Sequence, residues 1–138
     1  MRGAAAELVL NNYLRQALEQ EEIDAERVNT LLETTKLEGV AIDADTLEFA
    51  FRYNLQRMAE RLLANPTVDL LEQLDRAATL LDVVPFRVDL WKIQNACYRL
   101  LENVYPSMLG EAERGDATAQ TWVNSFRSLA TKLSIKVP

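Results

Sequence analysis

The sequence predicts an all-α fold: a compact bundle of five to six helices joined by short loops, with no sheet. Three observations lead to this prediction. Every long apolar pattern in the 138 residues recurs with a period near 3.6. Only four glycines and four prolines occur, and they lie between the periodic segments. Short β-like runs such as Val83-Val84 are isolated, so no pair of them can form a hairpin. We therefore expect residues 1–138 to form a single helical domain.

The first two helices are predicted over about residues 4–20 and 24–39. Asp24 is a suitable N-cap for the second helix, because its carboxylate can accept a hydrogen bond from a first-turn amide. Gly39 stands where a left-handed residue is needed at the C-terminus. The apolar stripe of the first helix comprises Leu10, Tyr13, Leu14, Ala17 and Leu18.

The third and fourth helices are predicted on either side of Asn65-Pro66, since a residue before proline disfavours helical geometry. Asp43 or Asp45 caps the third helix, and Asp45 also has capping-box spacing to a glutamate three residues later. Thr67 caps the fourth helix, which is expected to extend through Leu81.

The fifth helix is predicted from about Asp89, its N-cap, to Tyr105, where Pro106 ends or kinks it. Ser107 is expected to start only one short turn. Asp116 caps the last helix. The inward face of that helix is expected to carry Ala119, Trp122, Phe126, Leu129 and Leu133.

Composition excludes several function classes. The net charge is −6, from 21 acidic and 15 basic residues, so a nucleic acid is not expected as a partner. The chain has no histidine and therefore no imidazole base or imidazole metal ligand. No run approaches the ~20 apolar residues of a membrane span, so no membrane partner is expected. The start, Met1 to Ala6, lacks the long apolar stretch of a signal peptide.

Cysteine and carboxylate patterns predict no cofactor and no metal. Cys97 is the only cysteine, so no internal disulfide can form. This fits a reducing, cytoplasmic location, although a chain without disulfides can also be secreted. It falls on the apolar side of the fifth helix, so we expect a buried, unreactive thiol. The acidic cluster of residues 19–24 has no glycine for a calcium loop, which favours a solvated helix end.

The fifth helix contains the densest group of candidate binding residues. Trp91, Tyr98 and Tyr105 are seven residues apart and line one side, with Gln94 and Asn95 beside them. Aromatic rings next to amides can stack on a sugar or anchor another protein surface. The alternative is that the aromatics complete the core, and we expect this for Trp91.

The run from Pro85 to Asn95, together with Tyr98, resembles the signature of a helical C-terminal region in bacterial proteins related to glycoside hydrolase family 57. These proteins are described as α-amylase or α-mannosidase related. The resemblance extends over most of the chain, through segments 22–33, 58–66 and 115–135.

The resemblance implies an excised C-terminal domain whose parent acts on α-glucans or related polysaccharides. In that family the catalytic carboxylates lie in an N-terminal (β/α)-type barrel, which nothing in this chain resembles, so no catalytic residue can be assigned. The expected partners are therefore the barrel of the same parent chain and a polysaccharide. Two other hypotheses remain: a stand-alone helical protein-interaction module and, less favoured, a small helical enzyme, for which no catalytic constellation is visible.

Overall fold

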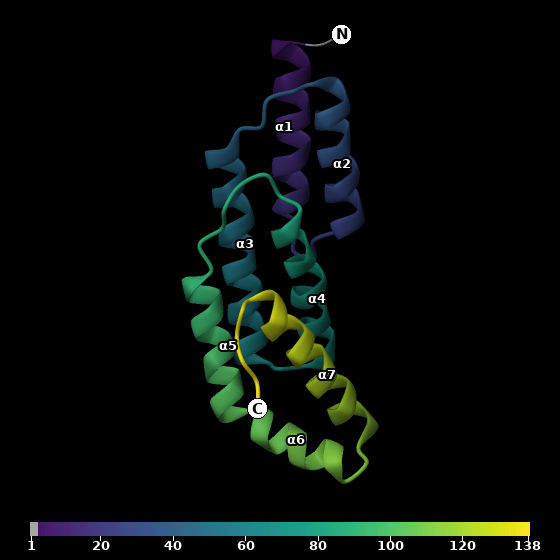
Figure 1. Ribbon diagram of the computed structural model, residues 1–138, viewed down its shortest axis with the longest axis vertical. Helices are drawn as coiled ribbons and strands as arrows, with labels where there is room; N and C mark the ends of the chain where they lie inside the picture. The colour runs from purple at the N-terminus through teal and green to yellow at the C-terminus, as the bar shows by residue number, and fades with distance from the viewer. Residues whose placement is uncertain (1–2) are drawn as a thin grey trace.

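The computed structural model describes residues 3–138, and within that range the chain is helical without a strand (Figure 1). The all-α prediction is confirmed. The described residues form seven α-helices rather than five to six. Met1 and Arg2, part of the segment expected not to be a signal peptide, lie outside the described residues.

The elements are α1 (Ala4–Leu18), α2 (Ala25–Glu38), α3 (Ala44–Ala64), α4 (Val68–Ala78), the 3-10 turn η1 (Thr79–Asp82), α5 (Trp91–Asn103), α6 (Tyr105–Glu113) and α7 (Ala117–Lys132).

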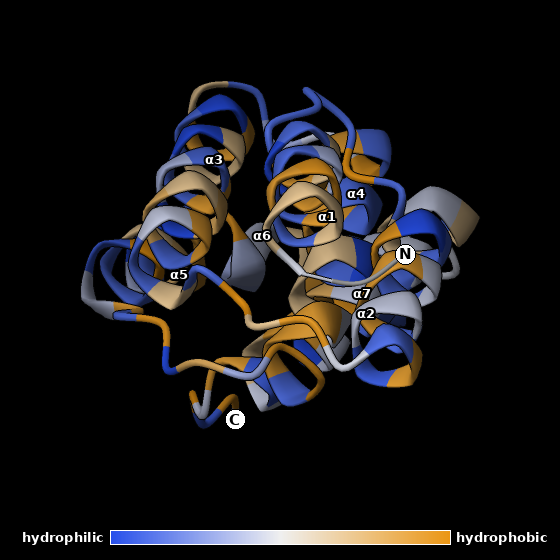
Figure 2. Cartoon of the chain, turned by 90° about the horizontal axis from the view of Figure 1, so that it is seen from above, coloured by the Kyte–Doolittle hydropathy of each residue, from blue (hydrophilic) through white to orange (hydrophobic). Residues whose placement is uncertain are grey.

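The molecule is elongated, and α3 connects its two ends (Figure 1). α1 and α2 pack at one end, while α6 and α7 pack together at the other. α3 contacts α1, α4 and α5, and α4 also packs on α7. Seen from above, α1 lies between α2 and α3 (Figure 2). Any surface built on α3 and α5 is therefore supported by the whole bundle.

Four N-caps predicted from the sequence are confirmed. The side chains of Asp24, Asp43, Thr67 and Asp116 each accept a hydrogen bond from the amide three residues later, at 2.9 to 3.4 Å. Asp43, not Asp45, caps α3. These bonds satisfy first-turn amides that have no partner inside the helix.

The start of the fifth helix differs from the prediction. α5 begins at Trp91, and its N-cap position is Leu90, which has no side-chain capping bond. Asp89 lies one residue further out, where its carboxylate still accepts a hydrogen bond from the Trp91 amide at 3.1 Å. The predicted cap at Asp89 is thus displaced by one residue, although its carboxylate still satisfies a first-turn amide.

The additional helix is α6, where the sequence predicts only a short turn from Ser107. Pro106 lies in the first turn of this nine-residue helix. Proline is tolerated there because its missing N–H would have no intrahelical partner. The predicted fourth helix is shorter than expected: α4 ends at Ala78, and η1 continues the chain past Leu81.

The core contains the aromatic residues predicted for the last helix. Trp122 and Phe126 are fully buried and stacked, with ring centroids 5.1 Å apart. The Trp122 Nε1–H donates to the carbonyl of Pro66 at 2.9 Å, so this indole also holds the turn between α3 and α4. Burial with a satisfied N–H is the arrangement that a core tryptophan requires.

Asn54 is one of two buried polar side chains among residues 3–138, the other being Thr35. Its Nδ2 donates to the carbonyls of Leu18 and Gln20, each at 2.7 Å. The last carbonyls of a helix have no intrahelical donor, so this amide from α3 completes the C-terminal end of α1. The contact fixes α1 on α3 at one place.

We predict that Asn54→Ala lowers the free energy of unfolding by about 1–3 kcal/mol, because two carbonyls then lose their donor. Urea denaturation measures the change. Asn12→Ala is the matched control, since Asn12 is exposed on α1 and should change stability by less than about 0.5 kcal/mol. Equal effects of the two substitutions would contradict the role given to Asn54.

Candidate functional site

Trp91 is 65% exposed and Tyr98 is 47% exposed, so the expectation that Trp91 belongs to the core is wrong. α5 buries Ile93, Cys97 and Leu100 against the rest of the bundle. At about 100° per residue, Trp91 and Tyr98 lie on nearly the opposite side of the helix from this buried stripe. No second helix covers them within the described part of the chain.

The other residues predicted for the site lie in different environments in the structure. Gln94 is half-buried, and its Nε2 donates to the carbonyl of Leu133 at 2.8 Å, closing the end of α7. Asn95 is exposed. Tyr105 leaves the aromatic row, because it lies in α6, is buried and bonds through its hydroxyl to the carbonyl of Pro138 at 3.2 Å.

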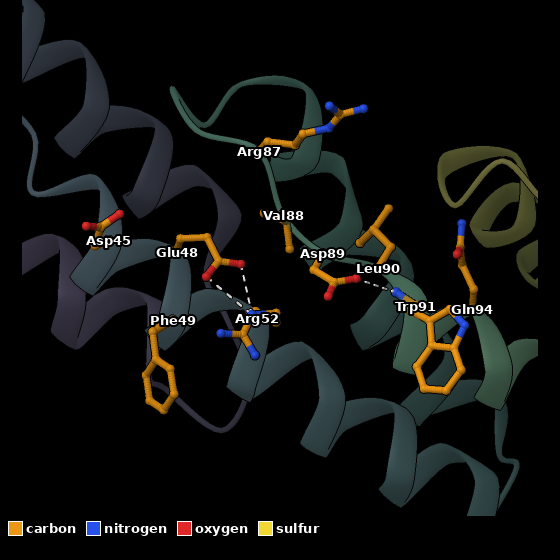
Figure 3. A pocket seen from close by; sticks show the side chains of 10 residues that line it. All are labelled: Asp45, Glu48, Phe49, Arg52, Arg87, Val88, Asp89, Leu90, Trp91 and Gln94. Carbon is orange, nitrogen blue, oxygen red and sulfur yellow. Dashed lines mark hydrogen bonds and ion pairs between the residues drawn. The ribbon is translucent and has the colours of Figure 1, made fainter.

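A groove of about 1060 Å³ lies between α3 and the segment that leads into α5 (Figure 3). Phe49 lines it from α3, and Trp91 and Gln94 line it from α5. The rings of Phe49 and Trp91 project to the same side (Figure 3). Tyr98 and Asn95 do not line this groove, so the structure brings together two of the four candidate residues.

Three polar side chains of the groove, Glu48, Arg52 and Asp89, are held by contacts with their neighbours. The Nε of Arg52 donates to both carboxylate oxygens of Glu48, at 2.9 and 3.2 Å. The guanidinium of Arg52 also lies 5.5 Å from the centroid of the Phe49 ring, within the range of a cation–π contact. The bond from the Trp91 amide holds Asp89 at the other end. The groove is therefore preorganised.

Phe49 also belongs to a second groove of about 480 Å³, which continues along α3 beside Tyr53 and Arg57. Phe49 is 56% and Tyr53 50% exposed, and their rings stack with centroids 5.8 Å apart. Arg57 lies over Tyr53 at 5.9 Å. We call Phe49, Tyr53 and Trp91, with the adjacent Arg52 and Arg57, the aromatic face.

Phe49 and Tyr53 were absent from the sequence-based candidates, although a signal for them exists. The apolar stripe of α3 includes Phe51 and Leu55, both buried. At helical spacing, positions 49 and 53 then fall on the outward side. Aromatic residues on a side that should be polar are the pattern that marks them.

Cys97 cannot serve as a nucleophile in the folded chain. The thiol is fully buried, and desolvation by burial raises its pKa from 9.0 to about 12. The thiolate is the reactive form of cysteine, and burial in apolar surroundings suppresses it. The expectation of a buried cysteine is confirmed.

Two other kinds of reactive site are conceivable: a metal site built from carboxylates, and a serine hydroxyl next to a lysine amine. Within residues 3–138, no group of three or more Cys, Asp or Glu side chains could hold a metal ion. Lys132 Nζ meets Ser128 Oγ at 3.0 Å and Asp75 at 2.6 Å, linking α7 to α4. None of the described grooves includes these three residues, so they join the two helices.

No protein family, curated protein or solved structure matches the chain. Among the described residues, no helix combines the length and apolar character needed to cross a bilayer. The aromatic face is therefore interpreted from its own geometry.

We predict opposite outcomes for the two tryptophans. Trp122→Ala should lower the free energy of unfolding by roughly 3–5 kcal/mol, because it empties a fully buried site. Trp91→Ala should cost less than about 1 kcal/mol, because the indole is mostly in solvent. Denaturant melts compare the two variants, and a large loss for Trp91→Ala would show that its side chain is part of the core.

We predict that the Cys97 thiol reacts with a disulfide reagent at least about 100-fold more slowly in the folded chain than in urea at pH 8. Raising the pH from 8 to 9 should speed the reaction in urea, where the thiol titrates near its ordinary value. The folded chain should stay slow, because its thiol pKa is about 12. Fast labelling of the folded chain would contradict this burial.

Proposed function

We propose that the chain is a non-catalytic helical domain of a bacterial carbohydrate-active protein resembling glycoside hydrolase family 57. It packs on a catalytic barrel or shapes the cleft of that barrel, whose substrate is an α-glucan-type polysaccharide. The observation that carries the proposal is the aromatic face, on which Trp91, Phe49 and Tyr53 are each half or more exposed.

Exposed aromatics gathered over two helices support an interaction role. Large aromatic side chains left in solvent forgo the stabilisation of burial, and contiguous exposed apolar surface marks interaction sites. Trp91 belongs to the sequence run that resembles the family. Phe49 lies on another helix and outside that run, yet both line one groove. Two independent features of the chain thus converge on one surface.

The groove has the character of a binding surface rather than a reaction centre. Glu48 is the half-buried carboxylate in it, and both of its oxygens accept from Arg52. General acid–base catalysis by a glycosidase needs two carboxylates placed on either side of a glycosidic bond. A carboxylate whose two oxygens both accept from one arginine N–H is poorly suited to that work. We assign the domain to the cytoplasm, where a lone buried thiol stays reduced.

A stand-alone protein-interaction module is the second candidate. Leu37 at the end of α2 is 79% exposed, and Leu8 near the start of α1 is also exposed. These side chains favour an additional protein contact at the end of the molecule formed by α1 and α2. The module differs from the first candidate in that it needs no barrel in the same reading frame.

We predict that the reading frame upstream of Met1 encodes a (β/α)-type barrel and that this barrel, produced separately, binds the chain. Trp91→Ala should weaken the association by at least about tenfold, because central exposed tryptophans dominate interfaces. Surface plasmon resonance measures the affinity. Val83→Ala is the control, since Val83 is an exposed apolar residue that lies outside both grooves.

The chain alone should not hydrolyse maltooligosaccharides, and product analysis by chromatography tests this. Turnover that follows the chain through purification would contradict the non-catalytic assignment. The absence of an upstream barrel would favour the stand-alone module.

A further inference from the structure

We infer that the groove between α3 and α5 is itself a binding site for a neutral oligosaccharide of hexopyranose units. The inference rests on the proposed function, because it names the ligand of the same aromatic face. Its argument comes from three properties of the groove: two apolar platforms, polar groups with unused hydrogen-bonding capacity, and a lining without net positive charge.

The platforms are the rings of Phe49 and Trp91. Both are more than half exposed and project to the same side of the groove (Figure 3). A pyranose ring has an apolar face of C–H groups and a rim of hydroxyls. A flat aromatic ring at the groove surface matches the apolar face and leaves the hydroxyls directed toward neighbouring polar groups.

The polar groups retain donors and acceptors for hydroxyls. Arg52 uses Nε for Glu48, and within residues 3–138 its two Nη groups donate no hydrogen bond. Gln94 donates from Nε2 to Leu133, which leaves its Oε1 as an acceptor. A hydroxyl both donates and accepts, so it is suited to a rim of this mixed kind. Because these side chains are already held in place, binding orders few additional groups.

The charge of the groove favours a neutral ligand. Its lining has three carboxylates, Asp45, Glu48 and Asp89, and two guanidinium groups, Arg52 and Arg87. Glu48 and Arg52 neutralise one another. In Figure 3 the guanidinium of Arg87 points away from Phe49 and Trp91. The Arg52 guanidinium beside Phe49 is already paired with Glu48. An anionic ligand would therefore meet the remaining carboxylates, Asp45 and Asp89, and like charges in close contact oppose binding.

The size of the surface favours several sugar units over one. The groove measures about 1060 Å³, and Phe49 joins it to the second groove along Tyr53. This volume lies at the upper end of the roughly 300–1,000 Å³ found for small-molecule pockets. Phe49 and Trp91 lie at opposite ends of the lining (Figure 3), so only an extended ligand could contact both rings.

The test is titration of the purified chain with maltoheptaose, followed by calorimetry and by tryptophan fluorescence. Saturable binding is expected, with a change in tryptophan emission that is lost in Trp91→Ala, because the other tryptophan, Trp122, is fully buried. Trp91→Ala and Phe49→Ala should each weaken binding by about tenfold or more. Arg52→Lys should also weaken it, because lysine keeps the charge but lacks the planar fork of donors.

Tyr98→Ala is the matched control. Tyr98 is an exposed aromatic on the same helix as Trp91, but it does not line the groove. Its removal should leave affinity unchanged. Circular dichroism confirms that each variant is folded. An anionic oligogalacturonate of the same length should bind at least about tenfold more weakly than maltoheptaose.

Absence of saturable binding to maltoheptaose would overturn the inference. So would equal losses in Trp91→Ala and Tyr98→Ala, or tighter binding of the anionic chain. The titration needs no barrel, so its failure removes the sugar site and leaves the barrel association standing. Failure of the barrel association removes the domain assignment and leaves a measured sugar site standing.

Discussion

The amide of Asn54 decides how α1 and α3 meet. It reaches from α3 to two carbonyls at the end of α1, at 2.7 Å each, and the bond to Leu18 is buried while the bond to Gln20 is partly buried. Buried carbonyls without a donor are costly, so this contact selects one axial position and one rotation of α3. With Asn54 turned inward, Phe49 and Tyr53 lie on the outward side of the same helix. The geometry of the aromatic face depends on that rotation.

Hydrogen bonds from side chains to backbone groups also hold other helix ends and connectors of the bundle in place. Gln94 donates to the carbonyl of Leu133 at the end of α7, and Trp122 donates to that of Pro66 between α3 and α4. Asn11 donates to the carbonyl of Ala41 and accepts from the amide of Asp43, fixing the connector before α3. Helix ends leave backbone groups unpaired, and here neighbouring side chains satisfy them. Because Gln94 also lines the groove, one wall of the candidate site is tied to the end of α7.

The aromatic face adds little to the stability of the domain. Its core is complete without Trp91, since Ile93, Cys97 and Leu100 already fill the buried side of α5. Exposed aromatic rings that the fold does not need are available to a ligand or a partner. The paired charges of Glu48 and Arg52 beside Phe49 keep the groove polar, which distinguishes it from a purely apolar docking surface. A carbohydrate and the wall of a substrate cleft both suit this mixture.

The sequence by itself determined the helical class, the caps at Asp24, Thr67 and Asp116, and the burial of Cys97 and Trp122. These follow from local hydrogen bonding and from the 3.6-residue period, which act within one helix.

The tertiary structure alone decided that Trp91 stays in solvent, because the period locates one buried stripe but not whether a second helix covers the other side. It also decided that Phe49 and Trp91 share a groove, since their helices are brought together by packing between segments about 40 residues apart. The extra helix α6 has the same origin: Pro106 permits a helix to start, and packing of α6 on α7 stabilises it.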